Sequence, residues 1–269
     1  MDWFLLGIQL TGAYPLWRFW RANRNSSLLH VIYWTFLAWL AWAMLLVERA
    51  FRSDEDNAVE IYMALCLTGC AGIAVLGARR PLAGPWNFVV VGLLAVLLLP
   101  LAEGWGDLNL SAGRIFFLAA TLSVIGFNYG LTRLGPASVF LLAGCAILMV
   151  VTLKMAGFHN SRDSFVAEWG FGVITISPWI ALTVMCRKAK LRDDLDKAWL
   201  SFRDRYGMVW ALRIADQFNR SAANSGWPFR LTWAGVKGST AGYDKSALHT
   251  WEELIKRFGA AGSDESELH

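Results

Sequence analysis

The chain has 269 residues, of which 56% are hydrophobic and only 17% are charged, whereas about 25% of the residues in soluble domains are charged. This composition and a mean hydropathy of +0.40 exclude an ordinary soluble domain and indicate a protein that lies in a membrane. The net charge of +4 is small, and no nucleic-acid partner is expected. The four cysteines, at positions 66, 70, 145 and 186, lie in apolar runs, where a thiol acts as a small hydrophobic group and implies no disulfide framework.

Residues 1–27 form an aromatic and basic N-terminal segment for which two arrangements remain open. Trp3 near one end and Trp17 with Trp20 near the other are typical of the aromatic belts at the two faces of a bilayer, which favours a seventh span. Three residues weaken the case for a span: Gln9, Gly12 and Pro15. The alternative is a helix in the membrane plane or a re-entrant helix. No cleavable secretory signal is expected, because the basic residues follow the apolar stretch instead of preceding it.

Six apolar runs of bilayer length follow, and the centre of each run carries no charged residue. They cover residues 28–47, 58–77, 86–102, 115–132, 136–154 and 168–186. An α-helix needs about 20 apolar residues to cross a hydrocarbon core of roughly 30 Å, and a helix that is apolar on every side lies in lipid or protein. We therefore predict an all-α integral membrane protein, with six or seven transmembrane helices in a bundle and the six runs spread over residues 28–186.

The charges between these runs alternate in kind. One set of connections is basic and includes Arg79, Arg80, Arg133, Arg187 and Lys188. The other set is rich in acids and includes Asp54, Glu55, Asp56, Glu103 and Asp107. Because Lys and Arg are enriched in cytoplasmic loops, we predict a multi-pass protein of the inner (cytoplasmic) membrane with its C-terminus in the cytoplasm.

After residue 186 the composition changes, and we predict a small amphipathic cytoplasmic region over residues 187–259. Its first helix is indicated by apolar residues at steps of three and four: Leu191, Leu195, Ala198, Phe202, Tyr206, Val209 and Leu212. The alternation over residues 229–233 predicts a short strand or an extended arm, and a second helix is predicted near 246–258, with Gly259 as its stop. Residues 260–269 are expected to be a disordered acidic tail.

Two stripes of small residues are candidate helix-packing or partner surfaces. Gly126 and Gly130 form a GxxxG motif in the fourth run, and Cys66 and Cys70 lie one helical turn apart in the second. Small residues let the backbones of two helices approach closely. Packing within the bundle is the favoured interpretation, and contact with a partner chain is the alternative.

The sixth run is the least lipid-like. Thr175 and Ser177 add hydroxyl groups, and Pro178 removes a backbone donor and so frees a carbonyl in the preceding turn. Broken helices line the cavities of transporters, so a path for a solute is one interpretation. The favoured interpretation is a structural kink.

The N-terminal segment carries the residues predicted to anchor the protein to lipid head groups: Trp17, Arg18, Trp20, Arg21 and Arg24. Indole and guanidinium groups together suit anionic head groups at the cytoplasmic interface. In the C-terminal region, Trp199, Tyr206 and Trp210 project from the first helix. They are expected to dock onto lipid, onto the ends of the spans or onto a soluble partner.

No catalytic, cofactor-binding or metal-binding residue is predicted. The histidines, at positions 30, 159, 249 and 269, have no ligand spacing, and His30 and His159 are expected at opposite faces of the membrane. The uncharged centres of the runs count against a proton-coupled carrier and against a retinal protein. No nucleophile elbow, P-loop or dinucleotide motif is present in the sequence.

The leading hypothesis is therefore a non-catalytic structural or scaffold subunit of a membrane complex, with membrane lipids and other membrane-protein subunits as partners. It rests on the uncharged spans, the small-residue stripes and the aromatic C-terminal region. One alternative is a permease or exporter component for an apolar or neutral solute, with a path beside Pro178. Another is an intramembrane lipid-modifying enzyme that uses the interfacial carboxylates of Glu60, Glu103 and Glu168.

Overall fold

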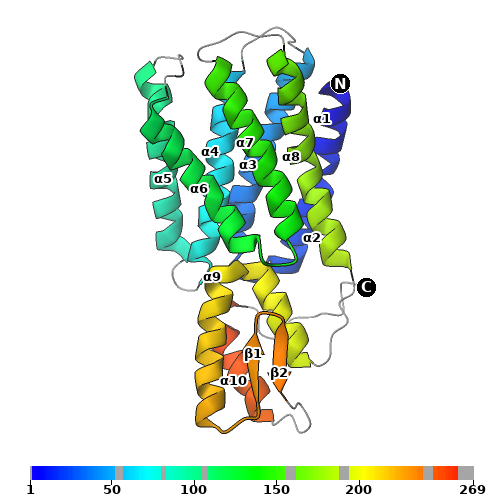
Figure 1. Cartoon of the computed structure of the whole chain (residues 1–269), viewed down its shortest axis with the longest axis vertical. Coiled ribbons are helices and arrows are strands. Elements are labelled where there is room, and N and C mark those ends of the chain that lie inside the picture. Colours follow the sequence, from blue (N-terminus) through cyan, green and yellow to red (C-terminus); the bar gives the residue numbers. More distant parts are fainter. Residues whose placement is uncertain are drawn as a thin grey trace.

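A computed structural model of the chain describes residues 2–51, 57–79, 83–104, 108, 110–155, 162–187, 194–238 and 245–259. They form a long helical bundle and a smaller C-terminal unit at one end of it (Figure 1). The bundle comprises α1 (Asp2–Thr11), α2 (Ala13–Asn23), α3 (Leu29–Phe51), α4 (Ala58–Ala74), η1 (Val75–Gly77), α5 (Ala83–Gly104), α6 (Ala112–Tyr129), α7 (Gly135–Met155) and α8 (Arg162–Cys186). The C-terminal unit comprises α9 (Asp194–Asn224), β1 (Phe229–Thr232), β2 (Gly235–Gly238), α10 (Lys245–Ile255) and η2 (Lys256–Phe258).

Six helices of the described residues are long and apolar enough to cross a membrane. They cover Leu29–Phe51, Ala58–Gly77, Gly84–Glu103, Ala112–Tyr129, Gly135–Leu153 and Phe165–Cys186. Each of the six predicted runs corresponds to one of these helices, which we call the spanning helices because of their length and composition. The prediction of a helical bundle with six helices able to span a membrane is confirmed at this coarse level. The fourth helix stops before the predicted end at 132, because the chain leaves the helix at Gly130. The chain also departs from an all-α fold in the β1–β2 hairpin.

The basic and the acidic connections between the predicted runs lie at opposite ends of the bundle. The ends of α4, α6 and α8 that lead to Arg79, Arg133 and Arg187 lie beside the C-terminal unit (Figure 1). The ends of α3 and α5 that carry Glu48 and Glu103 lie at the far end. The helices thus place the basic connections and the C-terminal unit at the same end, as the sequence predicts.

Helix α4 is the most buried of the six spanning helices, and its small residues allow this. It packs against α3, α5, α6 and α7. A Cβ atom on Gly69 would lie 2.9 Å from Cγ2 of Thr121, and one on Gly72 would lie 2.4 Å from Cγ1 of Ile125. Both neighbours belong to α6, so the absence of side chains on α4 lets α6 approach its backbone closely.

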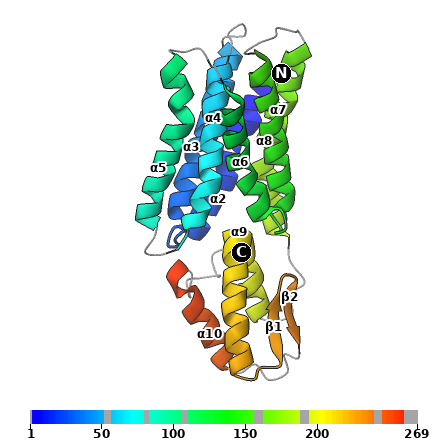
Figure 2. The ribbon, with the colours of Figure 1, turned by 60° about the vertical axis from the view of Figure 1, so that its left-hand side comes forward.

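The N-terminal segment runs along the bundle from one end to the other as α1 and α2 (Figures 1 and 2). Both helices pack against α3 and α8. At the far end Asp2 forms an ion pair with Arg49 of α3, with 3.7 Å between Oδ1 and Nη2. At the end beside the C-terminal unit, Nη1 of Arg18 donates to Sγ of Cys186 in α8, at 3.6 Å. This is the geometry of an additional traverse of the bundle, not of a helix lying flat across one end.

Two of the residues that weaken the sequence case for a seventh span have partners inside the bundle. Gln9 is 2% exposed, and its Nε2 donates to the carbonyl oxygen of Trp39 at 3.1 Å. Nε1 of Trp39 donates in return to the carbonyl oxygen of Gln9 at 3.0 Å. A Cβ atom on Gly12 would lie 3.2 Å from the same Trp39 nitrogen. The amide is therefore satisfied away from water, as an apolar surrounding requires.

The C-terminal unit has an aromatic core between α9, the hairpin and α10. Its buried members are Leu195, Trp199, Phe202, Phe218, Phe229, Leu231, Trp251 and Phe258. The strand predicted over 229–233 is β1, which pairs in antiparallel fashion with β2. The helix predicted near 246–258 is α10 with η2, and Gly259 ends it in the left-handed conformation, with φ 72°. These local predictions are confirmed, while Leu191 and the tail at 260–269 lie outside the described residues.

The predicted amphipathic stripe is correct as far as Tyr206 and wrong beyond it. Phe202 and Tyr206 are buried, whereas Val209 and Leu212 are 42% and 53% exposed. The reason is Gly207, which interrupts α9 with φ 75° and ψ −174°. The second limb of α9 is thereby turned, and its buried face is formed by Trp210, Ala211, Ile214, Phe218 and Ala222.

Candidate functional site

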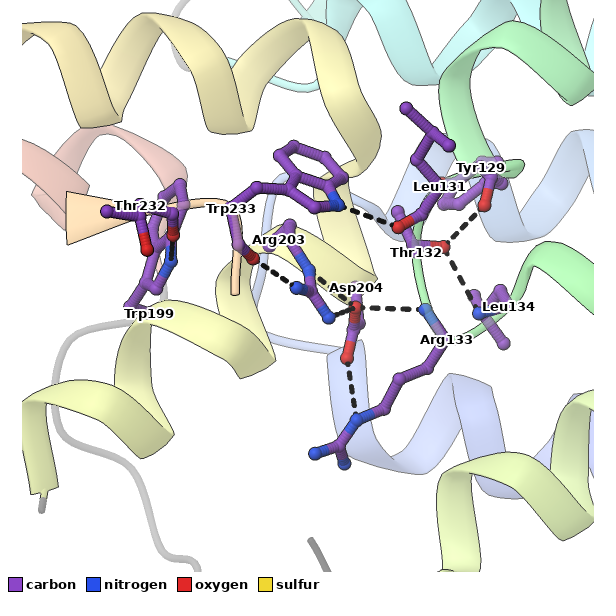
Figure 3. Close-up of polar contacts among 10 residues, drawn as sticks. All are labelled: Tyr129, Leu131, Thr132, Arg133, Leu134, Trp199, Arg203, Asp204, Thr232 and Trp233. Atoms are coloured by element: carbon purple, nitrogen blue, oxygen red, sulfur yellow. Dashed lines mark hydrogen bonds and ion pairs between the residues drawn. The ribbon is translucent and has the colours of Figure 1, made fainter. Parts of the chain in front are cut away.

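The C-terminal unit is joined to the bundle at the turn between α6 and α7, and Asp204 of α9 lies at the centre of this contact (Figure 3). Oδ1 of Asp204 accepts hydrogen bonds from Nε and Nη2 of Arg203, at 3.0 and 2.7 Å. The same oxygen accepts a hydrogen bond from the backbone N–H of Arg133, at 3.2 Å. Oδ2 lies 3.5 Å from Nε of Arg133. One carboxylate, only 3% exposed, therefore holds a residue of its own unit and a residue of the bundle.

Trp233, in the turn between β1 and β2, extends this contact. Nη1 of Arg203 donates to the carbonyl oxygen of Trp233, and the guanidinium carbon lies 5.2 Å from the centre of the Trp233 ring. Nε1 of Trp233 donates to the carbonyl oxygen of Leu131 at 2.8 Å. We call Leu131, Arg133, Arg203, Asp204 and Trp233 the Asp204 junction. Since a buried charge pair is stable only when its groups are hydrogen-bonded, the junction depends on all of these partners.

Thr132 fixes the turn that meets the junction. Its hydroxyl donates to the carbonyl oxygen of Tyr129 at 2.7 Å and accepts from the backbone N–H of Leu134 at 3.1 Å. Side-chain hydroxyls stabilise turns in this way because they satisfy backbone groups that no helix uses. The turn thereby presents the Arg133 N–H to Asp204, as Figure 3 shows.

The bend of α9 at Gly207 packs against the end of α6. A Cβ atom on Gly207 would lie 2.2 Å from Nδ2 of Asn128, and Oδ1 of Asn128 accepts from the backbone N–H of Val209 at 3.1 Å. One turn further on, Nε1 of Trp210 donates to the carbonyl oxygen of Val75, at 3.1 Å. Glycine is required here twice over, because φ is positive and because Asn128 fills the space of a side chain.

A third contact joins η2 to the segment that leads into α3. The carbonyl oxygen of Phe258 accepts from the backbone N–H of Ser27 at 3.0 Å and from the Tyr206 hydroxyl at 3.1 Å. The Phe258 ring packs edge-on against Phe202, Tyr206 and Trp210. Of the open alternatives for the aromatic face of α9, docking onto the ends of the spans holds for Trp210, whose Nε1 donates to the Val75 carbonyl oxygen. Tyr206 and Trp199 bond within the unit, to the carbonyl oxygens of Phe258 and Thr232.

The polar groups in these contacts serve to hold the two parts of the molecule together. The carboxylate oxygens of Asp204 are engaged by guanidinium groups and a backbone N–H, so the junction can position two parts of the molecule. Over the described ranges, no group of three or more His, Cys, Asp or Glu residues could hold a metal ion.

The candidate packing residues occupy two environments. Cys66 and Cys70 are completely buried in α4, and Sγ of Cys70 lies 4.0 Å from the Val90 carbonyl oxygen of α5. A Cβ atom on Gly126 would lie 2.6 Å from Cδ1 of Leu142 in α7, so this glycine also faces a helix of the same chain. Gly130 is exposed and caps α6, and a Cβ atom there would meet only the backbone of its own chain.

The candidate path residues lie between helices. Thr175 is 1% exposed and Ser177 is 6% exposed, and the Thr175 hydroxyl donates to the Gly172 carbonyl oxygen of the preceding turn at 3.0 Å. Helix α8 continues through Pro178. The carboxylate of Glu103, from the enzyme alternative, is held by Arg114 of α6.

The candidate head-group anchors lie on α2 at the end beside the C-terminal unit. Trp17 and Trp20 are both exposed, and the Arg21 guanidinium lies 5.8 Å from the centre of the Trp17 ring. Arg18 contacts Cys186, and Arg24 follows the helix and is exposed. They remain predicted anchors.

Sequence reasoning missed the residues of the junction. In the sequence, Arg203 and Asp204 resemble the charged, solvent-exposed face of a helix. Only the fold shows that the turn at Arg133 covers them. Gly207 offered a signal, because a glycine within an apolar helical stripe often has a packing reason. Gly144 and Gly170 were also missed, and Cβ atoms there would lie 2.5 Å from Ile174 and 2.8 Å from Leu148 across the α7–α8 contact.

Comparison of the chain with protein-family models, with curated proteins and with solved structures found no match.

Proposed function

We propose that the protein is a multi-pass protein of the inner membrane that acts as a non-catalytic structural subunit of a membrane complex. In this proposal the bundle lies in the bilayer and holds the C-terminal unit at the cytoplasmic surface, where other subunits bind. The observation that carries it is the Asp204 junction, in which a buried carboxylate of α9 binds the turn between α6 and α7.

The junction is one of several contacts that fix the orientation of the C-terminal unit. Trp210 bonds to the end of α4, Phe258 accepts from Ser27, two residues before α3, and Asp204 accepts from the turn after α6. Because these points come from three different connections of the bundle, a rotation about any one of them breaks the other two. A fixed orientation is what a scaffold needs in order to present one surface to a partner.

The exposure of the outer helix α5 supports the proposal of a partner within the membrane. This helix lies at the edge of the bundle in both views (Figures 1 and 2) and is the least buried of the six spanning helices. One face of α5 is exposed and apolar, and it carries Phe88, which is 80% exposed, with Val89, Val91, Val96 and Leu99. In a bilayer this face meets lipid or the helix of another subunit.

Purification from native membranes in a mild detergent, followed by sizing and mass spectrometry, tests the proposal. The tagged full-length chain should elute with stoichiometric partner subunits. The Asp204→Ala variant should lose those that bind the C-terminal unit, whereas Asp216→Ala, at an exposed carboxylate of the same helix, should retain them. Recovery of the wild-type chain as a lone 30 kDa species would overturn the proposal.

The permease and enzyme alternatives gain no specific support from the described residues. Thr175 and Ser177 are buried between helices, and Glu103 is occupied by Arg114. We therefore propose no second function.

A further inference from the structure

A basic cavity lies where the C-terminal unit meets the bundle, away from the Asp204 junction. Its volume is about 630 Å³, and it is lined by the second limb of α9, by α10 with η2, and by Arg79, two residues after η1. Helices α9 and α10 lie side by side in both views (Figures 1 and 2). A cavity of this size holds a small molecule or the head group of a lipid.

The walls of the cavity combine cations with an apolar floor. The cationic side chains are those of Arg79, Arg213, Arg220 and Arg257, with His249 beside them. The apolar part is formed by Trp210, Ile214, Leu254 and Phe258. The lining also contains one carboxylate, that of Glu253. A cluster of arginines favours an anionic ligand, because the planar guanidinium group matches the geometry of phosphate oxygens.

Internal ion pairs neutralise only part of this charge. Arg220 pairs with Asp216 at 2.7 Å, and Glu253 pairs with Lys256 at 3.4 Å. For Arg79, Arg213 and Arg257, the described part of the chain supplies no carboxylate partner. The contact found for Arg213 is with the Trp210 ring, 5.6 Å from the guanidinium carbon to the ring centre. Among the described residues, these three guanidinium groups thus have no competing carboxylate, as an anionic ligand requires.

The position of Arg79 indicates which source supplies the anion. Arg79 lies two residues beyond the end of the spanning segment Ala58–Gly77, and Trp210 of the cavity floor bonds to the Val75 carbonyl oxygen in that segment. In a protein that spans a bilayer, this level is that of the phospholipid head groups. A head group can thus reach the arginines while its glycerol and acyl carbons lie against the apolar residues.

We infer that the cavity between α9, α10 and Arg79 binds the phosphate group of an anionic phospholipid. The ligand touches the bundle through Arg79 and the C-terminal unit through Arg213 and Arg257, so its binding favours the docked arrangement of the two parts. This inference uses no partner subunit and stands apart from the proposed function.

The test is lipid binding by the full-length protein, measured by native mass spectrometry after titration with phosphatidylglycerol. Wild type is compared with the double variant Arg213→Gln/Arg257→Gln. The matched control is Arg230→Gln/Lys237→Gln, which removes the same charge from paired positions of the hairpin outside the cavity. All four substituted residues are exposed, so neither double variant removes a contact of the core. Equal melting temperatures of the two variants check this.

One lost arginine should weaken the affinity about fivefold, and the cavity double variant, which loses two, should weaken it about 25-fold, while the control matches wild type. The single variant Arg79→Gln, on the bundle side, should show its own loss. Equal affinity of the cavity variant and the control would overturn the inference. A second arm uses inorganic phosphate, and binding of phosphate as tight as that of the lipid would overturn the assignment to a membrane source.

Discussion

Gln9 of α1 and Trp39 of α3 exchange two hydrogen bonds between side chain and backbone, at 3.1 and 3.0 Å, within the bundle. The pair makes the N-terminal segment part of the bundle although it contains a polar residue. If α1 and α2 traverse the membrane, this exchange is what removes the cost of burying the amide.

The first prediction concerns this pair. Trp39→Phe removes the indole donor and leaves the Gln9 carbonyl oxygen without that hydrogen bond, which should destabilise the protein by about 1 kcal/mol. The control is Trp3→Phe, since Trp3 is 60% exposed. Thermal melting in detergent should show a lower midpoint for Trp39→Phe only. Equal midpoints for the two variants would contradict the role of the pair.

The second prediction concerns Asp204. Asp204→Ala leaves the buried guanidinium of Arg203 without its counter-charge, which should cost about 3–5 kcal/mol. Asp216→Ala breaks an exposed pair with Arg220 and should cost no more than about 0.5 kcal/mol. Limited proteolysis should cleave the C-terminal unit of Asp204→Ala much faster than that of Asp216→Ala. Similar cleavage of both would show that the carboxylate does not hold the unit in place.

A third prediction concerns backbone conformation and packing at Gly207. Gly207→Ala and Gly226→Ala both place a side chain at a positive φ, of 75° and 68°. Only Gly207 has a neighbour in the way, namely Asn128, and a Cβ atom at Gly226 would meet nothing within 4 Å. Gly226→Ala should cost about 1–2 kcal/mol, and Gly207→Ala should cost clearly more. The difference between the two melting midpoints reports the contact with α6 together with the ψ of −174° at Gly207, which is nearly exclusive to glycine. Equal midpoints would contradict both.

A fourth prediction compares two buried tryptophans of the C-terminal unit. Nε1 of Trp199 donates to the Thr232 carbonyl oxygen at 2.8 Å, whereas Nε1 of Trp251 has no hydrogen-bond partner within the described residues. Both substitutions to Phe lose packing area, but only Trp199→Phe also loses a hydrogen bond. It should be the more destabilising of the two, by about 1 kcal/mol in chemical unfolding. A larger loss for Trp251→Phe would contradict the assigned bond.

The predictable part of the fold is the part that local pattern determines. Six runs without a charge at their centres can form only buried or lipid-embedded helices, and the six spanning helices follow them. The strand at Phe229–Thr232 and the stop at Gly259 also depend on neighbouring residues alone. In each of these cases the signal and the structure lie in the same short segment of chain.

The unpredicted part depends on contacts between distant segments. Gln9 argues against a span until Trp39 supplies its hydrogen bonds. Val209 and Leu212 continue a helical stripe in the sequence, but the positive φ of Gly207 turns them outward. Asp204 has the character of a solvated residue, and only its contact with the turn at Arg133 makes it the centre of the junction.

The most direct test of the account is the side of the membrane on which each end of the chain lies. In a Cys186→Ser background the remaining cysteines are buried, so single cysteines can be introduced at two exposed residues, Trp3 and Ser225. Trp3 lies in the first turn of α1 and Ser225 directly follows α9, and the start of α1 and the end of α9 lie at opposite ends of the molecule (Figure 1). In spheroplasts, a membrane-impermeant maleimide should label Trp3→Cys at once and Ser225→Cys only after the membrane is opened. Labelling of both sites from the same side would contradict a traverse by α1 and α2, and with it the arrangement on which the proposed function depends.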